Sequence, residues 1–275
     1  MIQNILLHNG IAMPELGLGT YKIGRTDEEV YRAIRSALDI GYRHIDTATL
    51  YRNERPVGKA IRESGIPRDE VFVTTKLWGS DVLAGNVEGA FETSLRNMGL
   101  DYLDLYLVHW PVKGQLHATW KQMESIYHSG KTRAIGLSNH HIHHMEEALR
   151  EATVMPVVNQ VELHPYLAQE ELRDYCNRKN IAVQAWSPLG SNKIPLLNEE
   201  VLKDIGEKYG KSPAQVVLRW HLEKGVIAIP KSSHPDRQLE NFQVFDFRLT
   251  EEEIYRVDAL DREGRTGMHP DEIEF

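Results

Sequence analysis

The amino-acid sequence predicts an α/β fold, a (β/α)8 TIM barrel with an N-terminal β-hairpin and a C-terminal helix plus tail. Three observations predict it, and the first is the length of 275 residues, close to the ~250 residues of such barrels. The second is that eight short apolar runs alternate with helical patterns, as expected for strands buried on both faces of a parallel sheet. The runs are residues 16–19, 42–45, 71–75, 103–108, 132–137, 157–161, 181–185 and 226–229.

The third observation concerns the residues at the ends of these runs. A polar or aromatic residue closes each one, and up to Trp186 successive residues of this kind are 22 to 33 positions apart, about one strand–helix unit. In a closed barrel the carboxyl ends of the strands converge on one mouth, where active sites of this fold are built. The residues are Thr20, Asp46, Lys76, His109, Ser138, Gln160, Trp186 with Ser187, and Lys231.

Turn and capping signals predict the remaining elements. Asn9-Gly10 between two apolar runs predicts a two-residue hairpin. Thr26 begins a capping box and Ser212-Pro213 is a second helix start. Helical patterns cover residues 27–40, 199–209 and 250–260. We expect one domain over residues 1–275, with the last helix and the charged tail outside the barrel.

Composition and charge exclude several classes of protein. Apolar residues make up 41% of the chain, which rules out disorder, and no apolar stretch approaches the ~18 residues of a membrane span. The net charge of −8 argues against binding to nucleic acid or to anionic membranes. Cys176 is the single cysteine, which favours a reducing, cytoplasmic location. A closed barrel has no sheet edge that needs a partner, so we expect a monomer, with the oligomeric state left open.

Two glycine patterns resemble nucleotide-binding motifs and fail on inspection. After Gly17-x-Gly19, Lys22 stands where a dinucleotide fingerprint needs its third glycine. Gly24-Arg25-Thr26 lacks the lysine of a phosphate-binding loop, and the acidic helix start that follows would repel a phosphate. We reject both motifs.

The run His140-His141-Ile142-His143-His144 resembles a metal-binding motif, since His140 and His144 share one face at helical spacing. Transition-metal sites usually need a carboxylate or a third ligand nearby. Asn139 and Met145-Glu146-Glu147 instead indicate a solvated helix start. We therefore expect no metal site.

Asp46, Tyr51, Lys76 and His109 form the first set of residues expected at the mouth. Asp46 and Lys76 would form an ion pair in a partly desolvated site, and a lysine beside a phenol lowers its pKa from ~10 toward neutrality. Such a tyrosine can act as a general acid, while a histidine orients a carbonyl oxygen. The set predicts an apparatus that protonates an oxygen while another group attacks the carbon. A buried ion pair beside two unrelated residues is the structural alternative.

Two further sets suit a cofactor. Ser138, Asn139 and Gln160 offer polar anchors and Trp186 a flat face, which together suit a ring that carries a carboxamide. Near the last strand, a lysine, two serines, an arginine and a helix start make a phosphate-binding combination. These residues are Lys231, Ser232, Ser233 and Arg237. Arg237 has an alternative interpretation as a surface helix residue.

Five segments with recognisable motifs follow one another along nearly the whole chain. They are Gly41-Tyr42-Arg43-His44-Ile45-Asp46-Thr47-Ala48-x-x-Tyr51 with Asn53-Glu54-x-x-Val57-Gly58-x-Ala60, Leu103-Asp104-Leu105-Tyr106-Leu107-Val108-His109-Trp110-Pro111, Gly136-Leu137-Ser138-Asn139, Asn159-Gln160-Val161-Glu162-Leu163-His164-Pro165 and Ile229-Pro230-Lys231-Ser232. Together they resemble the motifs of the aldo-keto reductase family, and within the family the chain is most similar to bacterial 2,5-diketo-D-gluconate reductases and prostaglandin F synthase-type members.

The resemblance implies a barrel that binds NADPH without a Rossmann domain. It implies Tyr51 as proton donor, Lys76 and Asp46 as its tuners, and His109 as the residue that orients the carbonyl. The implied cofactor contacts are Thr20 and Tyr21, Ser138, Asn139 and Gln160 at the carboxamide, Trp186 on the ring, Ser187, Pro188, Leu189 and Gly190 along the pyrophosphate, Lys231, Ser232, Ser233 and Arg237 at the 2′-phosphate, and Glu240 and Asn241 at the adenine. Tyr21, Trp78, His109 and Trp110 would contact the substrate.

Two positions depart from the common family pattern. His140 stands where many members carry phenylalanine, and Trp186 where many carry tyrosine, which affects cofactor fit. The loop after Trp110-Pro111 is short, since a helical pattern resumes near Ala118. A short loop leaves an open pocket and favours small or varied carbonyl substrates.

The sequence therefore predicts an NADPH-dependent reductase of aldehydes and ketones that uses no metal. Two alternatives remain: a Schiff-base aldolase with Lys76 as nucleophile, and a catalytically weak NADPH-binding sensor subunit on the same fold. The natural substrate stays open among diketogluconates, methylglyoxal and related dicarbonyls, β-keto esters and quinones.

Overall fold

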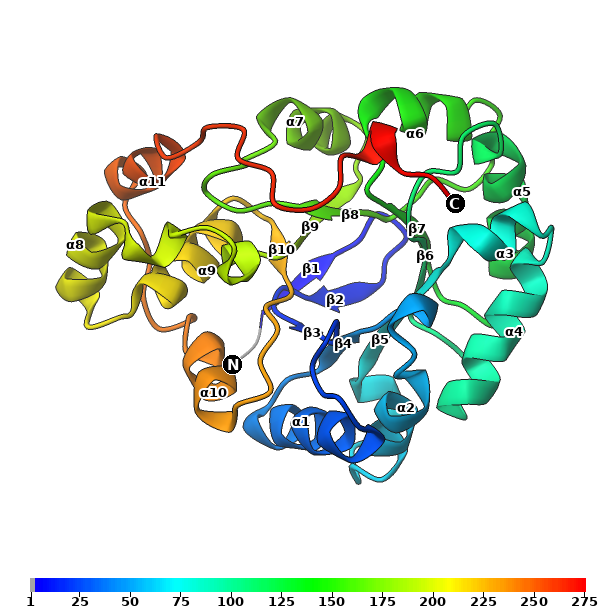
Figure 1. Cartoon of the computed structure of the whole chain (residues 1–275), viewed down its shortest axis with the longest axis horizontal. Coiled ribbons are helices and arrows are strands. Elements are labelled where there is room, and N and C mark those ends of the chain that lie inside the picture. The colour runs from blue at the N-terminus through cyan, green and yellow to red at the C-terminus, as the bar shows by residue number, and fades with distance from the viewer. Residues whose placement is uncertain (1–2) are drawn as a thin grey trace.

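Eight parallel strands follow one another in chain order around the ring of the computed structural model, which describes residues 3–275 (Figure 1). The first and last strands are joined by a bridge between Leu16 and Ala228, and Gly17 N donates to Ala228 O, so the barrel is closed. All eight predicted runs are confirmed as strands. They are β3 (Leu18–Gly19), β4 (His44–Asp46), β5 (Phe72–Leu77), β6 (Leu105–Val108), β7 (Ile135–Ser138), β8 (Val158–Glu162), β9 (Ala182–Trp186) and β10 (Ile227–Ala228).

Helices surround the strands and form the outer layer (Figure 1). The α-helices are α1 (Asp27–Ile40), α2 (Glu54–Arg62), α3 (Gly79–Leu83), α4 (Val87–Met98), α5 (Leu116–His128), α6 (Ile142–Ala148), α7 (Glu170–Arg178), α8 (Glu200–Tyr209), α9 (Pro213–Glu223), α10 (Pro235–Phe242) and α11 (Glu251–Asp258). The 3-10 turns are η1 (Thr49–Tyr51), η2 (Arg68–Glu70), η3 (Gly190–Asn192), η4 (Leu196–Asn198) and η5 (Pro270–Glu272). No helix within residues 3–275 has the length and apolar character that crossing a bilayer requires.

Capping explains where several helices begin. The Thr26 hydroxyl accepts a hydrogen bond from Glu29 N and the Glu29 carboxylate accepts one from Thr26 N, so the predicted capping box of α1 is confirmed. Ser212 caps α9 in the same way, with proline at the first helical position. The helices predicted over residues 199–209 and 250–260 are α8 and α11.

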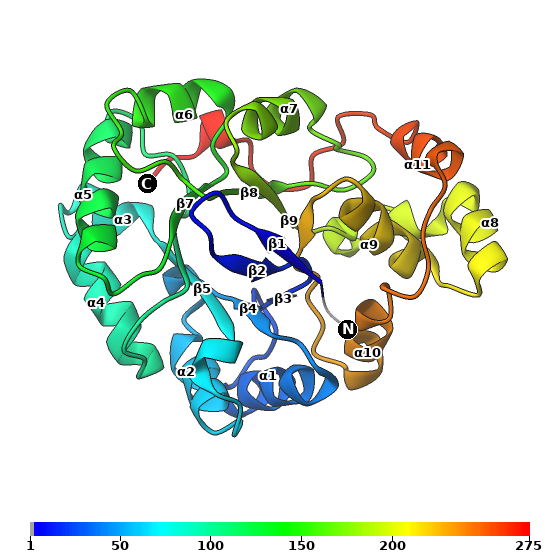
Figure 2. The same ribbon diagram turned by 180° about the vertical axis from the view of Figure 1, so that it is seen from behind.

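The N-terminal hairpin pairs β1 (Asn4–Leu6) with β2 (Ala12–Pro14). The prediction of a hairpin is confirmed, but its two-residue turn is wrong. Leu7 N donates to Ile11 O at 2.9 Å, so the turn has three residues, and Gly10 takes a φ of +83°. This is the left-handed position that follows a tight turn in three-residue hairpin loops and that glycine adopts most readily. The hairpin covers one end of the barrel (Figure 2).

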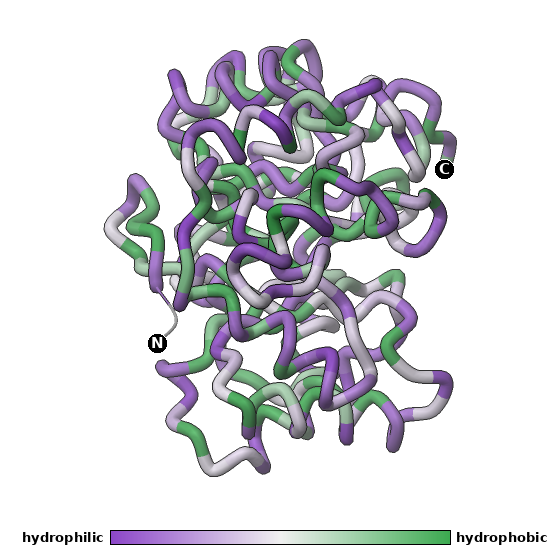
Figure 3. Tube along the Cα trace, turned by 90° about the vertical axis from the view of Figure 1, so that its left-hand side faces the viewer, coloured by the Kyte–Doolittle hydropathy of each residue, from purple (hydrophilic) through white to green (hydrophobic). Residues whose placement is uncertain are grey.

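Two apolar clusters stabilise the fold. The larger lies between the strands and the helices, and the smaller fills the barrel interior at the end that the hairpin covers. In the smaller cluster Leu7 and Met13 pack with Phe72, Leu107 and Ile227. Figure 3 shows hydrophobic segments concentrated inside the molecule and hydrophilic ones on its outer turns. The opposite end of the barrel is thereby left for polar side chains.

The Gly17-x-Gly19 pattern is explained by close packing inside the barrel. A Cβ at Gly17 would lie 2.5 Å from the His44 ring, and a Cβ at Gly19 would lie 2.8 Å from the Ile229 carbonyl oxygen. The two glycines let neighbouring strands approach, which accounts for them without a dinucleotide fingerprint.

The contact between α2 and α4 yields a prediction about stability. A Cβ on Gly58 would lie 2.1 Å from the Met98 carbonyl oxygen, a backbone atom that cannot move aside. We expect Gly58→Ala to lower the free energy of unfolding by about 1–3 kcal/mol, as overpacking does. Urea denaturation followed by circular dichroism measures this loss.

Gly89→Ala in α4 is the matched control. Its Cβ would meet the Asn86 side-chain oxygen, which can rotate away, so the higher helix propensity of alanine should leave the stability unchanged or raise it. Equal stability of the two variants would contradict the close α2–α4 packing.

Candidate active site

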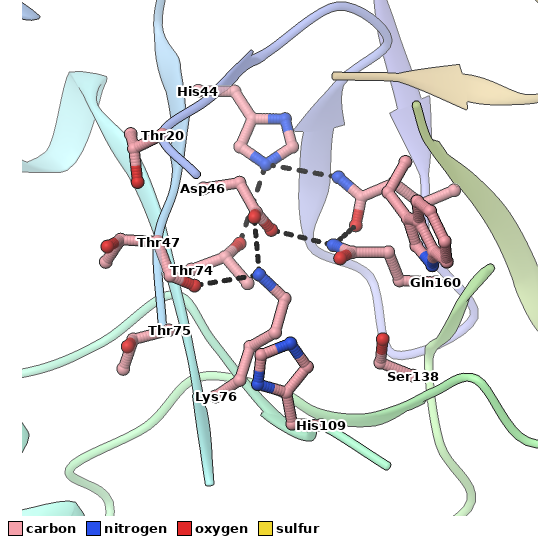
Figure 4. Close-up of polar contacts among 12 residues, drawn as sticks. Thr20, His44, Asp46, Thr47, Thr74, Thr75, Lys76, His109, Ser138 and Gln160 are labelled. Atoms are coloured by element: carbon pink, nitrogen blue, oxygen red, sulfur yellow. Dashed lines mark hydrogen bonds and ion pairs between the residues drawn. The ribbon is translucent and has the colours of Figure 1, made fainter. Parts of the chain in front are cut away.

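A buried ion pair forms the base of the site. Lys76 on β5 donates from Nζ to Asp46 Oδ1 at 2.5 Å and to the Thr47 carbonyl at 2.8 Å (Figure 4). Both charged side chains are inaccessible to solvent. Burial lowers the pKa of Lys76 and raises the pKa of Asp46, while their mutual attraction opposes both shifts. The pair that the sequence predicted is therefore present inside the barrel.

A chain of polar side chains continues from this pair across the barrel interior. Gln160 Nε2 donates to Asp46 Oδ2 and to Gln184 Oε1, both at 2.7 Å, and Gln184 Nε2 lies 3.4 Å from His44 Nε2 (Figure 4). Sequence reasoning gave Gln160 a cofactor contact, yet here its amide nitrogen binds protein groups. It also missed His44 and Gln184, although a glutamine in the middle of an apolar strand was a usable signal.

Tyr51 and His109 lie beside the ion pair. The Tyr51 ring is 5.6 Å from the His109 ring in an edge-on arrangement, and Lys76 Nζ is 5.2 Å from the centre of the Tyr51 ring. Tyr21, itself half exposed, stacks at a tilt 5.0 Å from Tyr51. The fold thus brings together all four residues of the predicted first set.

The protonation states correct one expectation from the sequence. Burial, followed by the negative charge of Asp46 and by Tyr21, holds the pKa of Tyr51 well above its usual value, so the predicted lowering is wrong for this arrangement. Burial and the Lys76 charge hold the pKa of His109 well below its usual range. At neutral pH the site therefore presents a protonated phenol and an uncharged imidazole.

Asn139 connects the second predicted set. Its Nδ2 donates to the His109 carbonyl at 2.9 Å and to Ser138 Oγ at 3.1 Å, and its Oδ1 accepts from the Trp186 indole at 2.7 Å. Asn139 has a φ of +60°, a conformation that asparagine adopts more readily than most residues. Trp186, where many family members carry tyrosine, is thereby held edge-on to Asn139. His140 is buried and pairs with the Ser138 carbonyl at 2.7 Å.

A cationic region follows β10. Lys231 and Arg237 lie close enough for Arg237 to lower the pKa of Lys231, together with a larger effect of burial. Within residues 3–275 neither side chain forms an ion pair with an acidic group. Two adjacent cations without a protein counter-ion suit a phosphate group.

The other predicted cofactor residues differ in their exposure and in whether their polar groups already have hydrogen-bond partners in the protein. Ser232 Oγ is bound to the His234 backbone, and Ser233 is exposed. Glu240 accepts a hydrogen bond from Ser212, so its carboxylate already has a partner, and Asn241 is buried. The segment Ser187, Pro188, Leu189 and Gly190 forms a tight loop, with positive φ at Ser187 and Gly190. The hydroxyl of Thr20 is buried without a partner among the described residues.

Aromatic rings form a wall beside His109. The Trp78 ring lies 5.3 Å from His109 and 5.1 Å from Phe275, each edge-on. Trp110, also predicted at the pocket, follows His109 directly and is partly exposed. Sequence reasoning missed Phe275, because only the path of the tail back to the barrel mouth reveals it.

A buried carboxylate holds that tail. Glu162 at the end of β8 accepts hydrogen bonds from His164 Nε2 at 3.1 Å, Thr266 N at 2.7 Å and Gly267 N at 2.9 Å. Burial alone would raise the pKa of Glu162, but these bonds lower it to about 2. Gly267 lies against the Trp186 ring, where a Cβ would approach within 2.4 Å. The tail thus packs against one side of the candidate site.

Comparison with known proteins agrees with this geometry. The model of the aldo/keto reductase family matches residues 15–262. The chain is 49% identical over 271 residues to the glyoxal reductase of Bacillus subtilis (strain 168), covering 98% of this chain and 97% of that protein. It is 50% identical over 268 residues to the 9,11-endoperoxide prostaglandin H2 reductase of Trypanosoma cruzi (strain CL Brener), covering 97% and 94%.

A solved structure extends the comparison to the fold. The crystal structure of an aldo-keto reductase enzyme from a Medee basin deep-sea metagenome library superposes with a TM-score of 0.95 at 43% identity, covering 98% of this chain and 100% of that one. The family match and the reductases among the relatives show that the chain is an oxidoreductase that acts on carbonyl groups. The chain belongs to the aldo/keto reductase family, and the family uses a nicotinamide cofactor. This assignment does not support the aldolase alternative.

The Glu162 anchor yields a prediction about pH dependence. Because the folded-state pKa, about 2, lies below the ordinary value of 4.5, the carboxylate stabilises the fold above pH ~4.5 and loses this effect as the pH falls toward 2. We expect Glu162→Gln to lower the free energy of unfolding by about 1–3 kcal/mol at pH 7 and by roughly half as much at pH 3. Urea denaturation across this pH range measures the difference.

Glu171→Gln on the exposed face of α7 serves as the control and should show no such convergence. A gap between wild type and Glu162→Gln that stays constant from pH 7 to pH 3 would show that the carboxylate is not held ionised by the tail.

Proposed function

We propose that this chain reduces small aldehydes and ketones, with α-dicarbonyls such as glyoxal as preferred substrates, and that it uses NADPH. The observation that carries the proposal is the buried Lys76–Asp46 pair beside Tyr51 and His109, at the carboxyl ends of β4, β5 and β6. The identity of 49% to a glyoxal reductase supports the substrate class. The short connection from Trp110 to α5, which begins at Leu116, leaves little chain to cover a large substrate.

Each residue of the site has a part in this proposal. A dihydronicotinamide held by Ser138, Asn139 and Trp186 would supply the hydride for the carbonyl carbon. His109, uncharged at neutral pH, donates a hydrogen bond that orients the carbonyl oxygen. Tyr51 then transfers its phenolic proton to that oxygen, because the developing alkoxide is a stronger base than phenolate.

Lys76 and Asp46 support the proton transfer. The Lys76 ammonium, 5.2 Å from the centre of the Tyr51 ring, stabilises the phenolate that remains after the transfer. Asp46 and the Thr47 carbonyl hold the ammonium in place. The raised pKa of Tyr51 keeps the phenol protonated between turnovers, which is the form that a proton donor needs.

Lys231 and Arg237 support a preference for NADPH over NADH. Both cations lack an acidic partner within the described chain; Lys231 lies in the loop after β10, and Arg237 lies in the first turn of α10, close enough to lower the pKa of Lys231. A 2′-phosphate carries two negative charges that this pair would neutralise, and the corresponding hydroxyl of NADH carries none. Ser233 is exposed beside this pair, while the Ser232 hydroxyl is already bound to the His234 backbone.

Removal of the Tyr51 hydroxyl tests the proposed chemistry. We expect Tyr51→Phe to lower kcat for glyoxal and methylglyoxal at least ~100-fold, because the proton donor is lost. NADPH binding, followed by quenching of tryptophan fluorescence, should stay within about twofold of wild type. Steady-state NADPH oxidation measures kcat.

Tyr255→Phe on the exposed face of α11 is the matched control and should leave kcat unchanged. A Tyr51→Phe enzyme with near-normal kcat would refute the assigned role. Tight NADPH binding by the wild type, with no oxidation across aldehydes, dicarbonyls and keto acids, would favour the sensor alternative. Borohydride trapping of a substrate adduct on Lys76 would revive the aldolase alternative.

Removal of a single cation tests the cofactor preference. We expect Lys231→Ala to raise the KM for NADPH about 10-fold or more, since a hydrogen bond to a charged group contributes ~1.5–3 kcal/mol, and to leave the KM for NADH nearly unchanged. Lys179→Ala, an exposed lysine beyond α7, is the control. Equal loss with both cofactors would contradict recognition of the 2′-phosphate by Lys231.

A further inference from the structure

Four metal-ligating side chains meet outside the active site, where the C-terminal tail crosses the start of α6. His141 precedes the helix, His143 and His144 lie in its first turn, and Asp271 belongs to η5. Figure 1 shows the C-terminal segment, in red, beside α6. Their ligating atoms all lie within 4.8 Å of one another. We call these four residues the tail cluster.

The spacing within the tail cluster suits a bound metal ion. Asp271 Oδ1 lies 2.9 Å from His143 Nε2 and 3.1 Å from His144 Nε2, and Asp271 Oδ2 lies 3.6 Å from His141 Nδ1. Two ligands of a tetrahedral Zn²⁺, each ~2.0–2.1 Å from the metal, stand roughly 3.3 Å apart. The distances from Asp271 to His141 and His143 thus lie close to the separation that one ion between two ligands would impose, and all the ligating atoms lie within 4.8 Å of one another.

The ligand types of the tail cluster suit a transition metal, since imidazole nitrogens and carboxylate oxygens are common ligands of Zn²⁺. The side chains of His143 and Asp271 are partly exposed, while those of His141 and His144 are largely covered by the surrounding chain.

His144 differs from the other two histidines in its hydrogen bonds. Its Nδ1 accepts from the His141 backbone N–H at 3.2 Å, so its proton lies on Nε2 and faces Asp271. This ring is therefore suited to hold the carboxylate of a metal ligand in place, as groups behind metal ligands commonly do. His269 also lies 3.6 Å from Asp271 Oδ2, and Arg265, which is 3.9 Å from Glu162, adds a positive charge nearby.

We propose that His141, His143 and Asp271 bind a divalent transition-metal ion such as Zn²⁺, with His144 orienting the carboxylate and water in the remaining position. Imidazole and carboxylate ligands select zinc, nickel or copper over magnesium or calcium. The His143 side chain is 62% exposed, so an ion can enter from solvent. The site is separate from the proposed function and does not depend on it.

The sequence alone does not predict this site, because the carboxylate that completes it lies outside the histidine run. Asp271, far along the chain, supplies the carboxylate. His140, which the helical spacing placed on the same face as His144, is not part of the tail cluster. His140 is buried and bonds to the Ser138 carbonyl. The run does begin a helix, as expected, since α6 starts at Ile142.

A metal ion here would fasten the tail close to the substrate pocket. Asp271 lies four residues before Phe275, whose ring packs edge-on against Trp78. Binding at the tail cluster would therefore restrict the segment that carries one wall of the pocket.

Calorimetric titration of tag-free protein with zinc chloride tests the proposal. We expect one ion per chain with a dissociation constant on the order of micromolar or tighter. His143→Ala and Asp271→Asn should each weaken binding at least ~10-fold, because each removes a ligand. His128→Ala at the exposed end of α5 is the matched control and should bind as the wild type does.

Hydrogen exchange supplies a second readout. Zinc should slow exchange of backbone amides in residues 264–275 of the wild type and leave Asp271→Asn unchanged, and it should raise the melting temperature of the wild type alone. Binding that is equal in His143→Ala, Asp271→Asn and His128→Ala would overturn the proposal. So would the absence of any wild-type binding tighter than about 100 µM.

Discussion

The buried ion pair between Lys76 and Asp46 constrains how the strands are arranged at the mouth of the barrel. Two charges this deep are tolerated only where each is paired and its remaining hydrogen-bonding capacity is used. The Thr47 carbonyl and the Gln160 amide meet that need. Because the partners come from β4, β5 and β8, these strands must keep their register for the pair to stay satisfied. Tyr51 and His109 are positioned by the ends of the same part of the sheet.

Burial of side chains has different consequences at the two ends of the barrel. At the hairpin end it stabilises the fold, since Leu7 and Met13 cover apolar strand residues. At the mouth it sets protonation states, keeping the Tyr51 phenol protonated and the His109 imidazole uncharged. The polar layer of Gln160, Gln184 and His44 separates these regions.

Local signals in the sequence predicted the parts of the molecule that local physics determines. The strands follow from apolar runs, and α1 and α9 from their capping residues. The residues at the barrel mouth were predictable because strand ends converge in a closed barrel. The hairpin turn is one residue longer than predicted because Leu7, and not His8, pairs with Ile11, which places residues 8–10 in the loop.

Contacts between distant segments were not predictable in this way. Glu162 meets Thr266 and His143 meets Asp271 only because the tail returns across the barrel mouth, a path that no local pattern records. The direction of the Tyr51 pKa shift was misjudged because the sequence shows which charges are near but not how much water is excluded. In the fold, exclusion of water outweighs the nearby lysine.

The contact between Gly267 and Trp186 limits the order in which substitutions can accumulate during evolution. The atom nearest to a Cβ at Gly267 belongs to the outer six-membered ring of the indole, and a smaller ring at position 186 would remove this contact and leave Glu162 Oε2, at 3.0 Å, as the next neighbour. A side chain at position 267 is therefore accommodated more easily once Trp186 has been exchanged for a smaller residue. Substitutions at these two positions, 81 residues apart in the sequence, are coupled through this contact.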